Sequence, residues 1–259
     1  MARVGLLHPG AMGAALGAQL VGRGHQVLWA SRGRSGSTAA RATRAGLLDV
    51  GSIDELLRRS ELVISVCPPH AAVETARSAS GFAGPFLDAN AVSPATAAAI
   101  AHAVGGRTAD GGIVGPPPTD SGTTRLYLSG SAAPDFQALF TGTAVDVRVL
   151  DDGGPYAASA LKMAFAAWSK GSAALLLATA DAADRLGVGD ALSHEWAISR
   201  PRLAAQLEAA QRDAAEKGWR WAGEMDEIAA TFGDVGLSPG FHEAAASTYR
   251  SRPQHRDPA

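Results

Sequence analysis

The sequence has one cysteine, few aromatic residues and no excess of either charge. Because Cys67 is the only cysteine among 259 residues, an intrachain disulfide and a metal site built from several thiolates are excluded. The 23 basic side chains do not outnumber the 25 acidic ones, so the chain lacks the positive surplus that binds nucleic acid or an anionic membrane. The expected partner is therefore a small molecule, with no nucleic acid and no membrane.

Long apolar runs are also missing. The longest, residues 173–180, is much shorter than the roughly 20 residues that span a bilayer. The N-terminus enters a β-type run at once, without a charged and then apolar leader. Together with the single cysteine, these features predict a cytoplasmic protein.

Short β-type runs alternate with helical runs up to residue 150, which predicts an α/β fold with a doubly wound parallel sheet. Helices are clearest at residues 11–22, 54–59 and 94–103, and Ser93 and Pro94 mark the start of the last one. Strands are expected at residues 3–7, 26–29, 62–66, 85–88, 107–113, 124–129 and 144–150.

After residues 151–155 the chain becomes rich in alanine and leucine at helical spacing, with no convincing strand. We therefore expect an α/β domain over residues 1–151 and a smaller all-α domain over residues 152–259. The first helix of the second domain, about residues 155–186, is long and has to bury an apolar face. A second copy of the chain is one place for that face, so we expect a homodimer joined through the helical domain.

A turn with two glycines follows the first apolar run, in the order His8-Pro9-Gly10-Ala11-Met12-Gly13. It occupies the place of the glycine fingerprint of dinucleotide-binding proteins, with His8 instead of the first glycine. A helix starting here would aim free N–H groups at a pyrophosphate, while Gly10 admits the phosphate and Gly13 allows close helix packing. His8 either closes the turn, with Pro9 setting its path, or touches the cofactor.

The second expected strand is followed by Ala30, Ser31, Arg32 and Arg34. An NAD site places an acidic residue here for the ribose 2′-hydroxyl, whereas an NADP site places arginine nearby for the 2′-phosphate. Because Ala30 holds the acidic position, the loop predicts NADP(H) in preference to NAD(H). A solvated basic loop is the alternative interpretation.

Another loop at the same edge of the expected sheet reads Cys67-Pro68-Pro69, after the strand at residues 62–66. Loops at this edge of a parallel sheet meet ligands, although a purely structural turn fits these residues almost as well. No base stands beside Cys67, so we expect a small, partly buried side chain rather than a nucleophile.

Taken in order, four segments resemble the superfamily of 3-hydroxyisobutyrate dehydrogenase and 6-phosphogluconate dehydrogenase, to which imine reductases are also similar. The likeness covers most of the first 150 residues and continues into the helix that carries Lys162. It implies a Rossmann-like domain followed by a helical one. The segments are residues 5–13, 24–32, 62–69 and 88–94.

The resemblance implies roles for individual residues. Gly10, Ala11 and Met12 would touch the pyrophosphate, and Ser31 and Arg32 would hold the 2′-phosphate. The nicotinamide pocket would be lined by Cys67, Pro68 and Asn90. We also count His8, Pro9, Arg34 and Pro69, from the same loops, among the cofactor-binding residues.

Lys162 matches the lysine that, in this superfamily, protonates the substrate oxygen. An ammonium group in an otherwise apolar helix is costly to bury alone, so Lys162 should face a cleft, as general acid and oxyanion stabiliser. The alternative is a surface lysine whose aliphatic stem packs on the protein while its charge stays in water.

Three polar residues of the family pattern are replaced, by Ala91, Val114 and Ala166. Anchors for a small carboxylate are thus missing, and 3-hydroxyisobutyrate is not the expected substrate. Residues 110–118, 123–130 and 162–171 instead resemble a smaller branch of phosphogluconate-dehydrogenase-like oxidoreductases, with a short helical C-terminal domain of unassigned function.

Candidate substrate contacts come from three places. Phe165 and Ser169 share a helix face with Lys162, whereas Lys170 lies off that face and is interpreted as solvated, with a proton donor as the alternative. The tryptophan-rich stretch at residues 219–227 forms either a lid over the substrate or part of a core or subunit interface. The full set is Gly112, Val114, Gly115, Phe165, Ser169, Trp221, Glu224 and Met225.

These expectations combine into an NADP(H)-dependent oxidoreductase of the β-hydroxyacid dehydrogenase type, with Lys162 as general acid and base toward a small carbonyl or hydroxy substrate. Imine reduction is the enzymatic alternative, because it needs less polar anchoring. A dinucleotide-binding sensor or structural protein without turnover is the alternative from another class. No spacing of histidines and carboxylates suits a metal.

Overall fold

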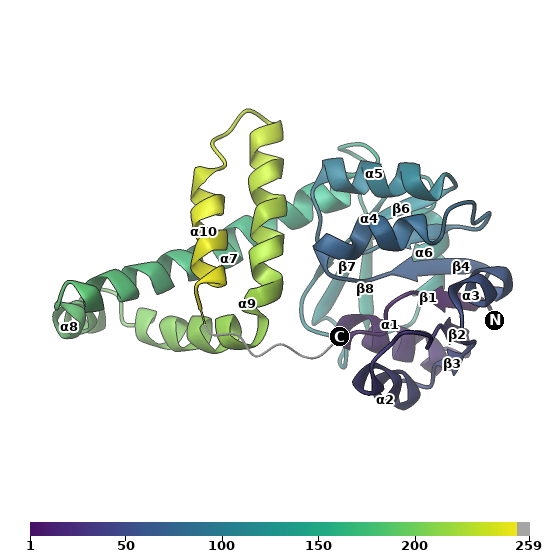
Figure 1. Ribbon diagram of the computed structural model, residues 1–259, viewed down its shortest axis with the longest axis horizontal. Helices are drawn as coiled ribbons and strands as arrows, with labels where there is room; N and C mark the ends of the chain where they lie inside the picture. Colours follow the sequence, from purple (N-terminus) through teal and green to yellow (C-terminus); the bar gives the residue numbers. More distant parts are fainter. Residues whose placement is uncertain (253–259) are drawn as a thin grey trace. The chain divides into compact units, whose positions relative to one another are not determined.

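The structure, a computed structural model, describes residues 1–252, which form two compact units. The first is an α/β unit that ends at Lys162, and the second, starting at Met163, contains only helices. Helix α7, Ala157–Arg185, belongs to both, because the division falls inside it and later than the composition change at residue 151. Figure 1 shows the order of the elements.

The α/β unit contains eight strands and six complete helices among its described residues. The strands are β1 (Arg3–Leu6), β2 (Gln26–Trp29), β3 (Leu48–Asp49), β4 (Leu62–Ser65), β5 (Phe86–Asp88), β6 (Thr108–Val114), β7 (Thr124–Ser129) and β8 (Val145–Val149). The helices are α1 (Ala11–Gly22), α2 (Gly36–Arg44), α3 (Ile53–Arg59), α4 (Pro69–Arg77), α5 (Pro94–Val104) and α6 (Ala133–Leu139).

All eight strands form one sheet in the order β3-β2-β1-β4-β5-β6-β7-β8. The chain winds outward from β1 in both directions, so the order reverses between β1 and β4. Strands β1 to β6 are parallel, and β7 turns antiparallel to β6. In open α/β sheets, ligands bind at the carboxyl ends of the strands beside such a reversal. The expected doubly wound, Rossmann-like fold is confirmed.

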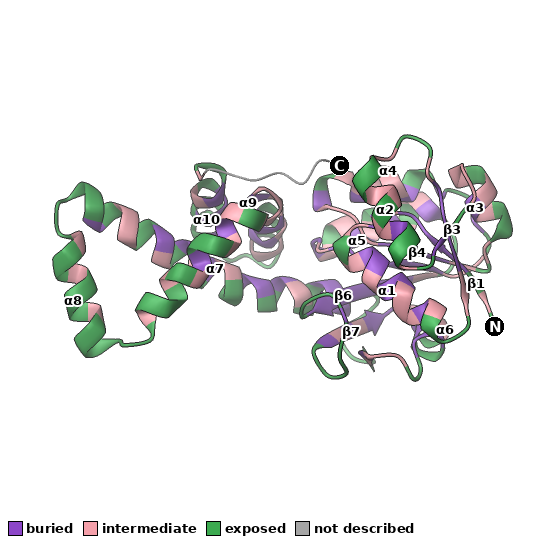
Figure 2. Ribbon diagram, turned by 90° about the horizontal axis from the view of Figure 1, so that it is seen from below, coloured by how far each residue is buried: buried purple, intermediate pink, exposed green. Residues whose placement is uncertain are grey.

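Helices cover both faces of this sheet, which explains the nearly continuous apolar character of its strands. One core contains buried side chains of α1, α2 and α6, and the other contains those of α3, α4 and α5. Neighbouring residues of a strand enter opposite cores, as Ile64 and Val63 of β4 do. Figure 2 shows the buried strands inside this unit.

The seven expected strands all form, with ends that differ by at most one residue from the expectation. Strand β3 was not expected. It has two exposed residues and pairs only with β2 at the edge of the sheet, so it is too short to carry a hydrophobic pattern.

Several helices begin with a serine cap, and two at the ligand edge do not. The hydroxyls of Ser35, Ser52 and Ser93 accept N–H bonds in the first turns of α2, α3 and α5, which confirms the expected cap at Ser93. Helices α1 and α4 follow β1 and β4, the strands at the reversal, and neither has a side-chain cap. The first N–H groups of α1 are therefore available to a ligand, whereas α4 begins with Pro69, which has no N–H.

The helical unit contains most of α7, followed by α8 (Gly189–Ser199), α9 (Leu203–Asp234) and α10 (Gly240–Arg250). Met225 of α9 and Tyr249 of α10 are fully buried, and the Tyr249 hydroxyl donates to the Lys170 carbonyl of α7 at 2.7 Å. Helix α8 has no buried residue, as its colouring in Figure 2 shows. Within the described part of the chain, no helix has the length and apolar character needed to cross a membrane.

We expect Gly13→Ala to destabilise the α/β unit, because a Cβ atom at Gly13 would lie 2.2 Å from the carbonyl oxygen of His8. The strain should lower the free energy of unfolding by about 1–3 kcal/mol, measured by urea denaturation. Gly22→Ala is the matched control at the end of the same helix, since its Cβ would meet nothing within 4 Å. Equal stability of the two variants would contradict the tight packing of the turn.

Candidate functional site

The turn between β1 and α1 has the features of a pyrophosphate site. Gly10 is the N-cap position of α1, and a Cβ atom there would meet nothing within 4 Å, so the space above it is open. The N–H groups of Ala11, Met12 and Gly13 begin the helix without a side-chain acceptor, and no acidic residue lies in this first turn. These residues fit the phosphate groups of a dinucleotide.

His8, which replaces the first glycine of the fingerprint, is joined to an arginine. Nε2 of His8 lies 2.6 Å from Nη1 of Arg34, and Nη2 of Arg34 donates to the Leu7 carbonyl at 3.2 Å. Because a guanidinium only donates, Nε2 must accept and the neutral ring carries its proton on Nδ1. Burial, and then the charge of Arg34, lower the pKa of His8 to about 4, so it is neutral at pH 7.

A second arginine holds the same turn. Nη1 of Arg41, on α2, donates to the carbonyl of Pro9 at 3.3 Å. Both arginines follow β2 in the chain, Arg34 from the loop that the sequence assigns to the 2′-phosphate and Arg41 from the helix after it. The pyrophosphate turn and the loop after β2 are therefore held together by side chains.

The two arginines in the loop after β2 differ in their exposure to solvent. Arg32 is exposed and its N–H donates to the Gly51 carbonyl, whereas Arg34 is half-buried against His8. The N–H of Ser31 donates to Oδ1 of Asp49 at 3.2 Å. Sequence reasoning missed Asp49, because it lies in the two-residue strand β3 and comes beside Ser31 only through sheet pairing.

The residues assigned to the nicotinamide pocket lie together. Oδ1 of Asn90, after β5, accepts from the N–H of Cys67, after β4, at 2.5 Å. Pro68 stands at the N-cap position of α4 and Pro69 in its first turn, where an N–H would have no partner within the helix. Burial raises the pKa of the Cys67 thiol to about 11, which agrees with a non-nucleophilic cysteine.

Lys162 belongs to the α/β unit and lies against β6. Its Nζ donates to the Ile113 carbonyl at 2.7 Å, and its side chain is partly buried. Gly112 makes this approach possible, since a Cβ there would lie 2.6 Å from the Ala158 carbonyl and 3.2 Å from Cβ of Lys162. The lysine is thus held over the strand next to β5, whose end carries Asn90.

The first turn of α7 is capped by side chains of the sheet. Oδ2 of Asp110, on β6, accepts from the Ser159 N–H at 2.7 Å, and Oδ1 accepts from the Ser159 hydroxyl at 2.5 Å. Oγ of Ser129, on β7, accepts from the Ala158 N–H at 3.1 Å. These bonds fix α7 one helical turn ahead of Lys162.

Other sequence-predicted substrate residues have contacts of their own. Val114 is buried in β6, and Gly115 closes the following loop at φ 122°, with no room for a Cβ beside the Thr123 carbonyl. Phe165 and Ser169 are exposed on α7, and the Ser169 hydroxyl donates to the Phe165 carbonyl.

In the helical unit, the interpretation of Lys170 as a solvated lysine is wrong. Its side chain is 12% exposed and forms an ion pair with Glu224, which is 7% exposed. Its Nζ also lies 5.6 Å from the ring centroid of Trp221, and Met225 is fully buried nearby in sequence. Sequence reasoning missed this pair, because 54 residues separate two charges that only the packing of α7 and α9 brings together.

The described residues contain no group of three or more His, Cys, Asp or Glu side chains that could hold a metal ion.

A hollow of about 650 Å³ lies in the helical unit between α7 and α9, and Trp168, Lys170 and Trp221 are among the residues that line it.

We expect the free energy of unfolding to fall between pH 6.5 and about 4, partly because of His8. In this range the unfolded chain binds a proton at His8 that the folded protein, with its lowered pKa, does not, so stability present above pH 6.5 is lost. His8→Gln keeps an acceptor for Arg34 without titrating. Urea denaturation at several pH values should therefore show a shallower loss in this variant, and parallel profiles would contradict the assignment.

Two family models match parts of the chain. Residues 3–87 match "NADP oxidoreductase coenzyme F420-dependent", and residues 183–251 match "Domain of unknown function (DUF1932)". Among curated proteins, none matches.

Solved structures resemble the chain over nearly its whole length. A conserved protein of unknown function, described as similar to 3-hydroxyacid dehydrogenases, is 27% identical with a TM-score of 0.70, and the match covers 96% of both chains. The 3-hydroxyisobutyrate dehydrogenase of Mycobacterium tuberculosis is 17% identical, with a TM-score of 0.68 over 96% of this chain and 93% of that one. A reductive aminase of Aspergillus terreus, in complex with NADPH, is 18% identical, with a TM-score of 0.59 over 99% and 96%.

One matched region lies in each part of the fold. The NADP oxidoreductase model covers β1 to β4 and most of β5, including the uncapped turn, and the second model covers α8, α9 and α10. These similarities support an NAD(P)-dependent oxidoreductase in the general sense. Together these matches support a place for the chain in the β-hydroxyacid dehydrogenase-like superfamily, in the form that carries a helical C-terminal domain.

Proposed function

We propose that the protein is an NADP(H)-dependent oxidoreductase in which Lys162 exchanges a proton with the substrate. The observation that carries the proposal is the position of Lys162. Its Nζ is bonded to the Ile113 carbonyl of β6, the strand next to β5, and Asn90 follows β5. A charged donor is thereby held next to residues suited to a nicotinamide. The experiment that tests it is NADPH oxidation with a substrate panel, read beside a Lys162 variant.

The residues of the chain would divide the work as follows. The N–H groups of Ala11 and Met12, with the open space over Gly10, hold the pyrophosphate. Asn90 fixes the Cys67 N–H and the loop at the reversal of strand order. When bound, the nicotinamide supplies the hydride for the reaction.

Lys162 would then act on the substrate oxygen or nitrogen. Its ammonium is oriented by the bond to the Ile113 carbonyl, so the charged group is held in a fixed direction. Donation of a proton as negative charge develops on a carbonyl oxygen stabilises the transition state, and the reverse transfer serves oxidation of an alcohol.

NADP(H) is the preferred cofactor. Ala30, directly after β2, stands where an NAD site has a carboxylate. Arg32 is exposed in the loop that follows, where its guanidinium can pair with a 2′-phosphate. The half-buried Arg34 supports this loop through His8, rather than standing in solvent.

Reduction of a C=N bond is the second candidate. Val114 and Ala166 are 5% and 1% exposed, so at both positions an apolar side chain stands buried where the family has a polar one. Such a site gives a small hydroxy acid little to bind but suits a less polar ketone or imine. A reductive aminase of Aspergillus terreus, whose fold resembles this one, is described in complex with NADPH4, cyclohexanone and allyl amine.

We also propose that two copies associate through their helices. Of twelve exposed large hydrophobic residues in the described chain, ten lie at Leu161 or later. Phe165, Trp168 and Leu175 on α7 are 50%, 80% and 55% exposed, an apolar surface that a second copy could cover.

Arg32→Ser should raise the KM for NADPH by about 10- to 100-fold, as expected for the loss of a charge-assisted bond, and change the KM for NADH little. Steady-state kinetics with both cofactors measure this. Arg44→Ser is the control, because it removes an exposed arginine of α2 from the same region. An equal loss for both cofactors would contradict a 2′-phosphate contact.

Lys162→Met should lower kcat for carbonyl reduction by about 10²- to 10⁴-fold and leave the Kd of NADPH unchanged, since only proton transfer is removed. Lys217→Met, which removes a partly exposed lysine of α9 that pairs with Asp213, is the control among only three lysines. Ketones and cyclic imines assayed in parallel separate the two reactions. Unchanged turnover removes Lys162 from the mechanism, and NADPH binding without turnover of any substrate favours a sensor.

A further inference from the structure

Two carboxyl groups lie side by side inside the α/β unit. Asp88 of β5 and Asp110 of β6 are partners in the register of two parallel strands, so their side chains leave the sheet on the same face. They are 4% and 5% exposed. Neither forms a salt bridge among the described residues. Two buried carboxylates at neighbouring positions repel each other strongly when both are ionised.

The surroundings of the two groups differ. Asp110 accepts both the N–H and the hydroxyl of Ser159 and stands at the N-terminus of α7, whose dipole favours negative charge. Asp88 accepts one bond, from the side-chain amide of Asn90, and its Oδ2 is buried without a partner. The structure therefore favours the charged form at Asp110 and the neutral form at Asp88.

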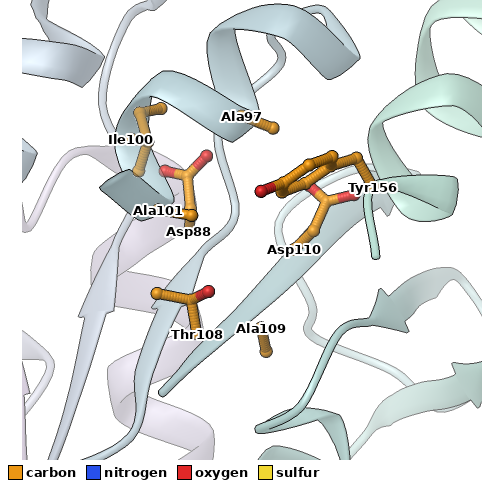
Figure 3. Close-up of a pocket in the computed structure, with 8 residues that line it drawn as sticks. All are labelled: Asp88, Ala97, Ile100, Ala101, Thr108, Ala109, Asp110 and Tyr156. Atoms are coloured by element: carbon orange, nitrogen blue, oxygen red, sulfur yellow. The ribbon is translucent and has the colours of Figure 1, made fainter. Parts of the chain in front are cut away.

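A cavity of about 10 Å³ has both Asp88 and Asp110 among the residues that line it. That volume is about the smallest that holds one water molecule. In Figure 3 the hydroxyl end of Tyr156 is directed toward Asp88, and the Asp110 carboxyl lies beside the tyrosine ring. The wall from α5 is apolar, made of Ala97, Ile100 and Ala101.

The titratable groups around Asp88 add no positive charge. Asp110 comes from β6, Tyr156 precedes α7, and Cys67 follows β4. Burial, and then the charge of Asp110, raise the pKa of Asp88 well above its usual value. Burial also raises the pKa of Asp110, while the bonds from Ser159 lower it.

We propose that Asp88 and Asp110 bind one proton and one water molecule between them, with Asp88 as the neutral acid and Asp110 as the ionised cap of α7. A neutral Asp88 can donate its proton to the water, or through it to Asp110, while it still accepts from Asn90. The orphaned Oδ2 is then satisfied, and the pair carries a single negative charge.

The pair is a positioning device for the proposed reaction. Asp110 fixes Ser159, one helical turn before Lys162, and Asp88 fixes Asn90, which holds the Cys67 N–H. This consequence depends on the proposed function, whereas the shared proton and the water do not. A second negative charge at Asp88 would push the two strand ends apart and disturb both contacts.

Infrared spectroscopy of the intact protein at pH 7 tests the shared proton. Wild type should show the carbonyl band of a protonated carboxylic acid shielded from solvent exchange, and Asp88→Asn should abolish it. Asp88→Asn should also keep the wild-type thermal midpoint, because the amide replaces a neutral acid of the same shape. Absence of the band from wild type, or its persistence in Asp88→Asn, would overturn the proposal.

Asp110→Asn tests the cap. It should keep the Asp88 band, lower the thermal midpoint, and lower kcat by about 10- to 100-fold without changing the Kd of NADPH. If this variant does not fold, Ser159→Ala removes one donor to Asp110 and should show smaller shifts of the same sign. A drop in stability with kcat unchanged would reject the positioning role, and an inactive wild type would reject the proposed function while the infrared result still stands.

A crystal structure at neutral pH tests the water. Density for one water within hydrogen-bond distance of Oδ2 of Asp88 is the expected result. A dry cavity, or Oδ2 of Asp88 bonded directly to Asp110, would overturn this part of the proposal.

Discussion

The close approach of α7 to β6 is the constraint on which the site depends. Gly112 removes the side chain that would collide with the helix backbone, and Asp110, two residues earlier in the same strand, caps the helix. Lys162 then reaches the Ile113 carbonyl on that strand. The carboxylate that caps the helix belongs to β6, and the lysine one turn later is bonded to the same strand. Both contacts with this rigid strand restrict the long, flexible lysine side chain. The sheet, rather than a loop, sets the direction of the ammonium group.

The replaced glycine of the nucleotide turn has a comparable explanation. A side chain at position 8 would block the phosphate position if it projected into the space over Gly10. The ring of His8 is instead bonded to Arg34. The arginine also binds the Leu7 carbonyl, so backbone and ring are held by one guanidinium. Gly13 keeps the close packing that the fingerprint requires, and the position that lost its glycine has gained a connection to the loop after β2.

Polar groups are buried in both units, and each is compensated in a different way. Lys170 and Glu224 neutralise one another inside the helical unit, whereas Asp88 accepts a hydrogen bond only from the Asn90 amide and is compensated by keeping its proton. Burial alone therefore does not tell whether a carboxyl is charged. The number of donors around it does, and Asp110 has several where Asp88 has one.

The alternation of apolar strands and helices determined the doubly wound sheet, the start of α1 and the serine cap of α5, because these depend on residues close together in the chain. The same holds for Lys162 as a candidate, since its neighbours on α7 and the ordered motifs are local features. Tertiary structure alone decided the contacts of His8 with Arg34, of Lys170 with Glu224 and of Ser31 with Asp49. It also decided that Asp88 stands beside Asp110, because strand register, and not sequence distance, brings two carboxyls to one buried point where only one charge is tolerated.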